Sequence, residues 1–417
     1  MHPTALPAPY RVGEWLPADQ EFLGQWLSEL ISKVEAQGEV PLLPVVAQFK
    51  EAVEADAELY MLFSTMLTQV PFRKTPTHDP QVRTIDHLFD LFNHVMTHAP
   101  EYNDTGLVGF PINAILDWSM GTHAGYAAFL NKKANHHFKN MLNAWGTFLT
   151  SADSTAVLID SPTGWFGADA LKKLGNLGED FVCDPQAPHY GFTSWDDFFT
   201  RQFRDGVRPI ASPGDPNVVV NACESAPYRV SENVAEHSRF WIKGQPYSVA
   251  HLLANDSLAP QFVGGTIYQA FLSAMSYHRW HSPVDGTIVK AYVQEGTYYS
   301  ETPAEGYDPS GPNDSQGYIA EVAARAIIFI EADNPAIGLI CVVPIGMAEV
   351  STCDITVYEG QHVTKGDQLG MFHFGGSTHC LLFRPGVSLT FDLHGQTPGL
   401  NSSNIPINSC IATVVTS

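Results

Sequence analysis

The sequence predicts an α+β fold, with an N-terminal helical domain followed by a mixed, mainly antiparallel β-rich domain. Apolar residues recur at helical spacing through the first part of the chain. From about residue 190 the pattern changes to short β-branched runs bounded by Gly and Pro. The 417 residues are 44% hydrophobic and 16% charged, which is enough to bury a large core. We therefore expect a helical domain (1–150), a connecting segment (151–189) and a β-rich domain (190–417).

A series of apolar stripes carries the helical prediction. Residues 19–37 place Phe22, Trp26 and Leu30 on one face of a helix. Comparable stripes cover 45–53, 59–66, 85–96 and 112–150, with proline-bearing breaks between them. Aromatic residues at this spacing usually pack, so we expect those of the helical domain to be core rather than ligand-binding.

The β-rich prediction rests on short apolar runs after residue 190, at 217–220, 286–289, 326–330 and 411–415. The most apolar stretch, about 336–350, is interrupted by Gly338, Pro344 and Gly346. It is therefore interpreted as buried strands joined by turns and not as a transmembrane span.

A polar loop between residues 295 and 317 is the one place where the sequence offers a cation site. It has five acidic residues, which are Glu295, Glu301, Glu305, Asp308 and Asp314. A solvated loop is one interpretation, and a calcium site on irregular backbone is the other, although no EF-hand spacing supports it.

Charge and cysteine usage exclude several classes of function. The net charge of -22, from 22 basic and 44 acidic side chains, argues against nucleic acid or an anionic membrane as a partner. The N-terminus lacks the pattern of a secretory signal, and the six cysteines are scattered without a Cys-x-x-Cys pair. We expect a cytoplasmic protein with reduced thiols and no stable membrane anchor. The sequence gives no indication of its oligomeric state.

The segment Phe374-Gly375-Gly376-Ser377-Thr378-His379 carries the most distinctive chemistry. Two glycines allow backbone conformations that other residues avoid, so the Ser377 hydroxyl can reach the Gly376 carbonyl. Its attack would convert the peptide bond into an ester, and β-elimination would leave dehydroalanine and then a pyruvoyl group at Ser377. The ketone of a pyruvoyl group forms a Schiff base with an amine and accepts the electron pair released on decarboxylation. A Gly-Gly-Ser-Thr segment alone is usually an ordinary turn.

Other segments give this motif its meaning. They are Tyr277-His278-Arg279-Trp280-His281-Ser282-Pro283, Lys365-Gly366-Asp367 and Phe372-His373-Phe374. With the Gly-Gly-Ser-Thr segment they resemble the pyruvoyl-dependent phosphatidylserine decarboxylase family. Blocks at 198–201, 208–210 and 243–248 extend the resemblance over about residues 190–417. The N-terminal half, with segments 222–225, 329–334 and 345–347, is similar to a fungal offshoot of that family, the soluble tryptophan (aromatic amino acid) decarboxylases.

The resemblance implies a fold of the phosphatidylserine decarboxylase type and autocatalytic cleavage between Gly376 and Ser377. It implies a covalent pyruvoyl cofactor derived from Ser377, and no PLP. The substrate would be a free aromatic L-amino acid, with L-tryptophan first and tyrosine or phenylalanine as co-substrates, and the products an arylalkylamine and CO2.

Three alternatives remain open. One is a phosphatidylserine decarboxylase. The second is a non-catalytic lipoyl-like binding module, suggested by the similar segments 283–289 and 357–363. The third is a serine hydrolase, whose Gly-x-Ser-x-Gly elbow is not matched because His379 occupies the last position.

The resemblance also assigns roles to residues. His281 would take the proton of Ser377 during self-cleavage, and His278 would handle protons around the decarboxylated adduct. Glu224 occupies the position of the family aspartate, and Asp285 and Asp354 are the reserve carboxylates. A His-x-x-His pair alone is too small a set for zinc, so no metal is assigned.

The aromatic residues nearest in sequence to the reacting groups are candidates for the substrate-binding slot. They are Tyr277, Trp280, Phe372 and Phe374. A place in the core is an equal alternative for each of them.

Overall fold

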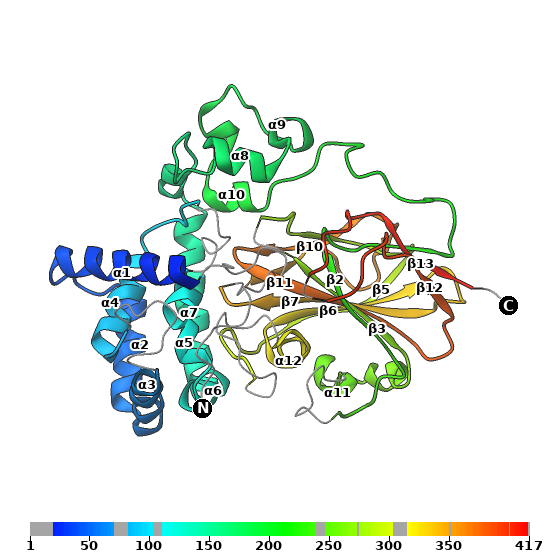
Figure 1. Cartoon of the computed structure of the whole chain (residues 1–417). Coiled ribbons are helices and arrows are strands. Elements are labelled where there is room, and N and C mark those ends of the chain that lie inside the picture. Colours follow the sequence, from blue (N-terminus) through cyan, green and yellow to red (C-terminus); the bar gives the residue numbers. More distant parts are fainter. Residues whose placement is uncertain are drawn as a thin grey trace.

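A computed structural model describes residues 20–70, 82–102, 111–238, 247–272, 275–302, 315–349, 352–399 and 401–415. A group of helices stands beside a body of packed β-sheets, and a smaller helical group lies above both (Figure 1). This arrangement confirms the predicted α+β class with its mainly antiparallel sheets.

The first half of the described chain is helical, as the apolar stripes predict. Its helices are α1 (Gln20–Gln37), α2 (Pro44–Ala55), α3 (Ala57–Gln69), α4 (Ile85–Val95), α5 (Pro111–Met120), α6 (His123–Leu130) and α7 (Lys132–Leu149). Side-chain caps satisfy free amides at several N-termini, as where Asp56 accepts from Glu58 and Leu59 at the start of α3. Phe49 shows how the stripes pack, since its ring contacts Phe63, Phe89 and Phe138 at centroid distances of 5.8, 5.2 and 4.8 Å.

The segment predicted as a connection also carries helical turns. They are η2 (Ala152–Val157), α8 (Ala168–Leu174), α9 (Leu177–Asp180) and η3 (Pro188–Gly191), followed by α10 (Trp195–Phe199). Because η2 follows α7 almost directly, the secondary structure marks no break at residue 150, and the domain limits stay a prediction.

The β-rich half forms one large sheet and two small ones. The large sheet has the order β2-β3-β11-β7-β6-β5-β9, and the small sheets are β4-β10-β8 and β1-β13-β12, with neighbouring strands antiparallel. The strands are β1 (Val218–Val220), β2 (Ala226–Glu232), β3 (Thr266–Leu272), β4 (Arg279–His281), β5 (Gly286–Gln294), β6 (Arg325–Ala332), β7 (Leu339–Met347), β8 (Thr352–Ile355), β9 (His362–Val363), β10 (Gln368–His373), β11 (Gly376–Phe383), β12 (Leu389–Phe391) and β13 (Cys410–Val414). Three short helices complete this half: α11 (Val249–Leu252), η4 (Ala259–Phe262) and α12 (Gln316–Val322).

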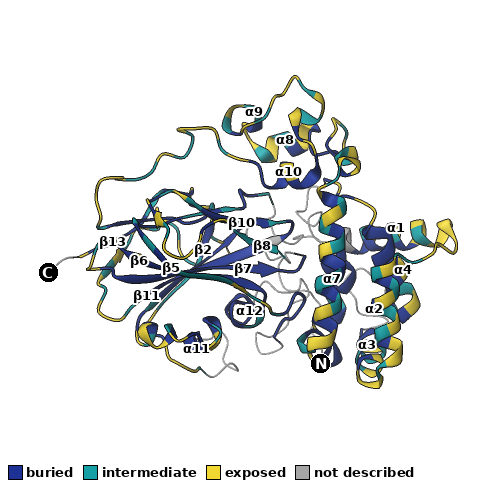
Figure 2. Cartoon of the chain, turned by 180° about the vertical axis from the view of Figure 1, so that it is seen from behind, coloured by how far each residue is buried: buried dark blue, intermediate teal, exposed yellow. Residues whose placement is uncertain are grey.

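Side chains alternate between two cores along the central strand β11. Cys380 and Leu382 belong to a cluster shared with the helices, whereas Leu381 and Phe383 belong to a second cluster with residues of the small sheets. The large sheet is therefore buried on both faces, and its strands are largely dark in the burial view (Figure 2).

The strands test the predictions made for the apolar stretch 336–350 and for the two lipoyl-like segments. The apolar stretch is one strand, β7, and not several strands joined by turns, so that prediction is wrong. Pro344 is compatible with strand β7. In the pairing of β7 with β6, Val342 and Ile345 have partners but Pro344 has none, and proline has no N–H to donate. The two lipoyl-like segments pair with each other, with Gly286 opposite Val363.

Candidate active site

The predicted cleavage site lies where the chain passes from a small sheet to the large one. β10 ends at His373, and β11 begins at Gly376. The two residues between them have positive φ angles, 53° at Phe374 and 121° at Gly375. Glycine adopts such angles freely, but a left-handed phenylalanine costs roughly 1–2 kcal/mol. The unusual backbone therefore stands directly before the Gly376-Ser377 bond.

Aromatic packing holds Phe374 in this conformation. Its ring lies 4.3 Å from Trp145 of α7 and 5.0 Å from Trp195 of α10, both edge-on, and 6.3 Å from Phe199. Two helical elements, α7 and α10, thus fix the turn, and Phe374 is 5% exposed.

Ser377 occupies the middle of the large sheet, opposite Leu272 of β3 and Gly346 of β7. Its side chain is buried, and its hydroxyl has no hydrogen-bond partner among the described residues. The adjacent hydroxyl of Thr378 differs, because it donates to the Ala270 carbonyl at 3.0 Å. No acceptor or donor therefore restrains the oxygen that the sequence identifies as a nucleophile.

His281, which the resemblance assigns as the base for Ser377, ends β4. Its Nε2 lies 3.0 Å from the Tyr277 hydroxyl. Burial lowers the pKa of His281 to about 4, so the imidazole is uncharged at neutral pH and can accept a proton.

His278 lies in a different environment from His281. Its ring is fully buried and stacks on Phe199, with centroids 4.0 Å apart. That the two histidines reach one pocket stays a prediction. No group of three potential metal ligands occurs among the residues that the structure describes.

Glu224 is engaged elsewhere. Both carboxylate oxygens accept from the Arg208 guanidinium, at 2.7–3.2 Å, and Oε2 also accepts from the Ile407 amide at 2.8 Å. The reserve Asp285 accepts from the amide of Lys365. Within the described part of the chain, His281 interacts with the Tyr277 hydroxyl and the Gly366 backbone, and neither is one of the predicted carboxylates.

The structure separates the four aromatic residues proposed for a substrate slot. Trp280 and Phe372 are fully buried in the second core and contact each other at 5.1 Å, so we remove them from the slot. Tyr277 packs on Phe203 at 4.4 Å and points its hydroxyl at His281. Phe374, in contrast, lines a cavity formed by described residues.

This cavity has a volume of about 260 Å³ and lies beside the cleavage turn. One wall is a stripe along α7, and the other is made of residues near Phe374. The lining residues are Leu142, Asn143, Gly146, Thr147, Thr150, Asp196, Glu349, Thr352, His373 and Phe374. They include two carboxyl groups and one imidazole but no Lys or Arg.

A charged pair lies at the edge of the cavity. Nδ1 of His373 lies 2.9 and 3.0 Å from the two Asp196 oxygens, and its Nε2 lies 3.5 Å from Asp354. The pKa of His373 is raised: burial lowers it, but the two aspartates outweigh burial. Neither Asp196 nor His373 was predicted as a site residue, although His373 lies in the Phe372-His373-Phe374 segment next to the Gly-Gly-Ser motif.

Comparisons with known proteins identify the family of this chain. Two family models, both described as phosphatidylserine decarboxylase, match residues 43–174 and 195–398. The L-tryptophan decarboxylase of Psilocybe cubensis is 40% identical over 91% of this chain and 89% of its own length. The chain belongs to the phosphatidylserine decarboxylase family.

Other relatives of this decarboxylase span part of the chain. Decarboxylase iboD of Amanita muscaria is 46% identical over 68% of this chain and 86% of its own length. Phosphatidylserine decarboxylase proenzyme 3 of Schizosaccharomyces pombe is 34% identical over 49% of this chain and 20% of its own length. The protein is an enzyme of the carboxy-lyase class.

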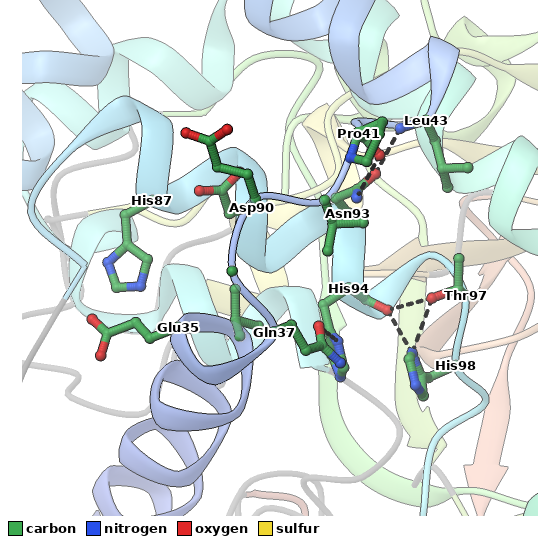
Figure 3. Close-up of a pocket in the computed structure, with 14 residues that line it drawn as sticks. Glu35, Gln37, Pro41, Leu43, His87, Asp90, Asn93, His94, Thr97 and His98 are labelled. Atoms are coloured by element: carbon green, nitrogen blue, oxygen red, sulfur yellow. Dashed lines mark hydrogen bonds between the residues drawn. The ribbon is translucent and has the colours of Figure 1, made fainter.

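A larger cavity, of about 850 Å³, lies in the helical part of the decarboxylase (Figure 3). Residues of α1, α4 and the segments next to them line it, including Glu35, His87, Asp90, His94 and His98. No strand residue contributes to it, so its size does not connect it with Ser377.

The predicted calcium loop is only partly described. Glu305, Asp308 and Asp314 lie outside the described residues. Glu295 forms an ion pair with Lys139, and Glu301 is buried. Calcium therefore stays a prediction. No helix in the described ranges combines the length and the apolar character needed to cross a membrane.

Proposed function

We propose that this decarboxylase processes itself and then converts a free aromatic L-amino acid into the arylalkylamine and CO2. L-Tryptophan is the principal substrate, with tyrosine and phenylalanine as co-substrates. The observation that carries the proposal is the buried hydroxyl of Ser377, unrestrained by hydrogen bonds and directly after the Phe374-Gly375 turn. The relative at 40% identity over 91% of the chain is named L-tryptophan decarboxylase.

In the proposed maturation, Ser377 Oγ attacks the Gly376 carbonyl and the neutral ring of His281 accepts the hydroxyl proton. The resulting pyruvoyl group supplies a ketone that binds the substrate amine and takes up the electron pair left when CO2 departs. Relatives named proenzymes support a processing step. Six free cysteines support a cytoplasmic location.

The proposed substrate site is the 260 Å³ cavity beside Phe374. A cavity of about 150 Å³ holds benzene, so this one has room for a larger aromatic side chain. Arg and Lys favour the binding of a phosphodiester, and none of the described residues that line this cavity is an Arg or a Lys. Phosphatidylserine is therefore the second candidate.

Side-by-side assays test the substrate. Purified protein is incubated with L-tryptophan, L-tyrosine, L-phenylalanine and phosphatidylserine vesicles, and CO2 and amines are measured. We expect the free aromatic amino acids to be turned over fastest. Faster turnover of phosphatidylserine would transfer the assignment to the second candidate.

Cleavage assays test the residue roles separately. His281→Ala is expected to stay uncleaved, because the hydroxyl loses its base. Glu224→Ala is expected to stay uncleaved as well, since its carboxylate holds Arg208 and the Ile407 amide in the segments around the site. His278→Ala is expected to cleave. An uncleaved His278 variant beside a normally maturing His281 variant would reverse the assignment.

A further inference from the structure

Glu349 is a buried acid that the proposed function leaves unused. It follows β7, lines the cavity beside Phe374 and is 1% exposed. Its Oε1 accepts a hydrogen bond of 2.8 Å from the Asn113 amide in the first turn of α5. Its Oε2 has no hydrogen-bond partner in the part of the chain that the structure describes. One carboxyl oxygen is thus anchored, and the other is buried without a partner beside the cavity.

Building on the proposed function, we propose that Glu349 is the proton donor that completes decarboxylation. The bond between the α-carbon and the carboxylate carbon breaks, and CO2 leaves. The electron pair left behind takes the proton from Glu349 Oε2 and forms the new C–H bond of the amine. A solvent proton then restores the carboxyl group.

The protonation state of Glu349 suits this role. Burial raises its pKa to about 8, although the Asn113 amide opposes the shift. At pH 7 the side chain is therefore mainly the neutral acid. The other titratable groups of the cavity, Asp196 and His373, pair with each other, and Tyr299 is the remaining titratable group that interacts with Glu349.

The two nearby histidines fit this role less well. His278 is fully buried against Phe199 and does not line the cavity. His373 lines it, but Asp196 lies at Nδ1 and Asp354 at Nε2. Of the acids that line the cavity, Glu349 has an oxygen without a partner among the described residues, so we assign to Glu349 the proton transfer first expected of His278.

A purely structural role also has to be tested, because Glu349 joins the start of α5 to the end of β7. Glu349→Gln separates the two roles. The amide oxygen can still accept from Asn113, whereas the amide nitrogen cannot act as an acid. Glu321→Gln is the matched control, since Glu321 is a buried glutamate with a raised pKa that accepts from the Ser248 amide away from the cavity.

The experiment compares the cleaved proteins in D2O with L-tryptophan. We expect wild type and Glu321→Gln to place deuterium on one face of the amine α-carbon. Glu349→Gln should mature normally, but its kcat should fall by about 10²- to 10⁴-fold and its deuterium should lose facial selectivity.

Misplaced protonation gives a second readout. A proton delivered to residue 377 in place of the substrate carbon leaves alanine at that N-terminus and releases an arylacetaldehyde. Mass spectrometry and N-terminal sequencing should detect both in Glu349→Gln, and Glu349→Asp should partly restore normal product. A structural defect alone would slow the reaction without changing these outcomes.

Infrared spectroscopy of the uncleavable Ser377→Ala protein needs no turnover. At pH 7 the Ser377→Ala protein should show an infrared band of a protonated carboxyl group, and this band should vanish when Glu349→Gln is added to it. Facially selective deuteration at unchanged kcat in Glu349→Gln, or an ionised Glu349 at pH 7, would overturn the inference while leaving the proposed function intact. A wild type that decarboxylates no aromatic amino acid would overturn both.

Discussion

Replacing Phe374 with alanine tests whether aromatic packing holds the cleavage turn. The ring contacts Trp145, Trp195 and Phe199 and is almost fully buried. Alanine removes these contacts but keeps the side-chain carbon that makes a φ of 53° unfavourable.

The structure sets the size of the effect. Removing a core phenylalanine costs about 3–5 kcal/mol, whereas the left-handed conformation costs about 1–2 kcal/mol. Packing therefore outweighs strain by about 1–4 kcal/mol, and without it the turn relaxes to ordinary angles. The left-handed angles then cost an uncompensated ~1–2 kcal/mol, and each ~1.4 kcal/mol is a tenfold change in rate, so self-cleavage should slow by about 5- to 30-fold.

Phe49→Ala is the matched control. Phe49 is fully buried among three phenylalanine rings in the helical core and does not contact the turn. Both variants should lower Tm, but only Phe374→Ala should delay the appearance of the two pieces after pulse labelling and denaturing electrophoresis. Equal cleavage rates in the two variants would refute the argument that packing holds the turn.

Three further predictions concern maturation, substrate and acid stability. The purified protein should separate under denaturing conditions into residues 1–376 and 377–417, the smaller blocked by pyruvoyl; a single full-length mass, unaffected by Ser377→Ala, would contradict self-cleavage. Thr147→Phe should fill the cavity and raise KM for tryptophan by about tenfold or more without affecting cleavage, and an unchanged KM would place the substrate elsewhere. Burial lowers the pKa of His94 and His281 to about 4 and that of His379 to about 3, so between pH 6.5 and 4 the unfolded chain binds more protons than the folded one. Stability should therefore fall as pH falls from 6.5 to 4, and His94→Gln should weaken this pH dependence. A constant Tm over this range would contradict the prediction.

Periodicity was sufficient for the fold class but not for the direction of individual side chains. The two histidines of the His-x-x-His pair were expected to share a pocket. The structure places His281 at the end of β4 and His278 directly before that strand, which forms by pairing with β10 and is not revealed by the three residues Arg279–His281. Trp280 and Phe372 lie near the motif in sequence, but the alternation of side chains along β4 and β10 turns them into the second core.

The cavity could not be derived from any local pattern. Its walls combine a stripe of α7 with Asp196, Glu349 and His373, residues far apart in the sequence. Glu349 follows an apolar strand and resembles an ordinary solvent-facing residue there. Only the contact with Asn113, 236 positions away, shows that it is enclosed.

The position of β11 has a consequence for how the mature protein can form. Cleavage at Gly376–Ser377 would leave β11 hydrogen-bonded between β3 and β7 and β13 between β1 and β12, so one short polypeptide would be threaded through sheets of the other. A denatured mature enzyme would have to reassemble from two separate chains, at a rate that depends on their concentration. The precursor can instead bring β11 into place intramolecularly, at a high effective concentration. Folding would then have to precede maturation, and the persistence of the mature enzyme would depend on how slowly its central strand is released.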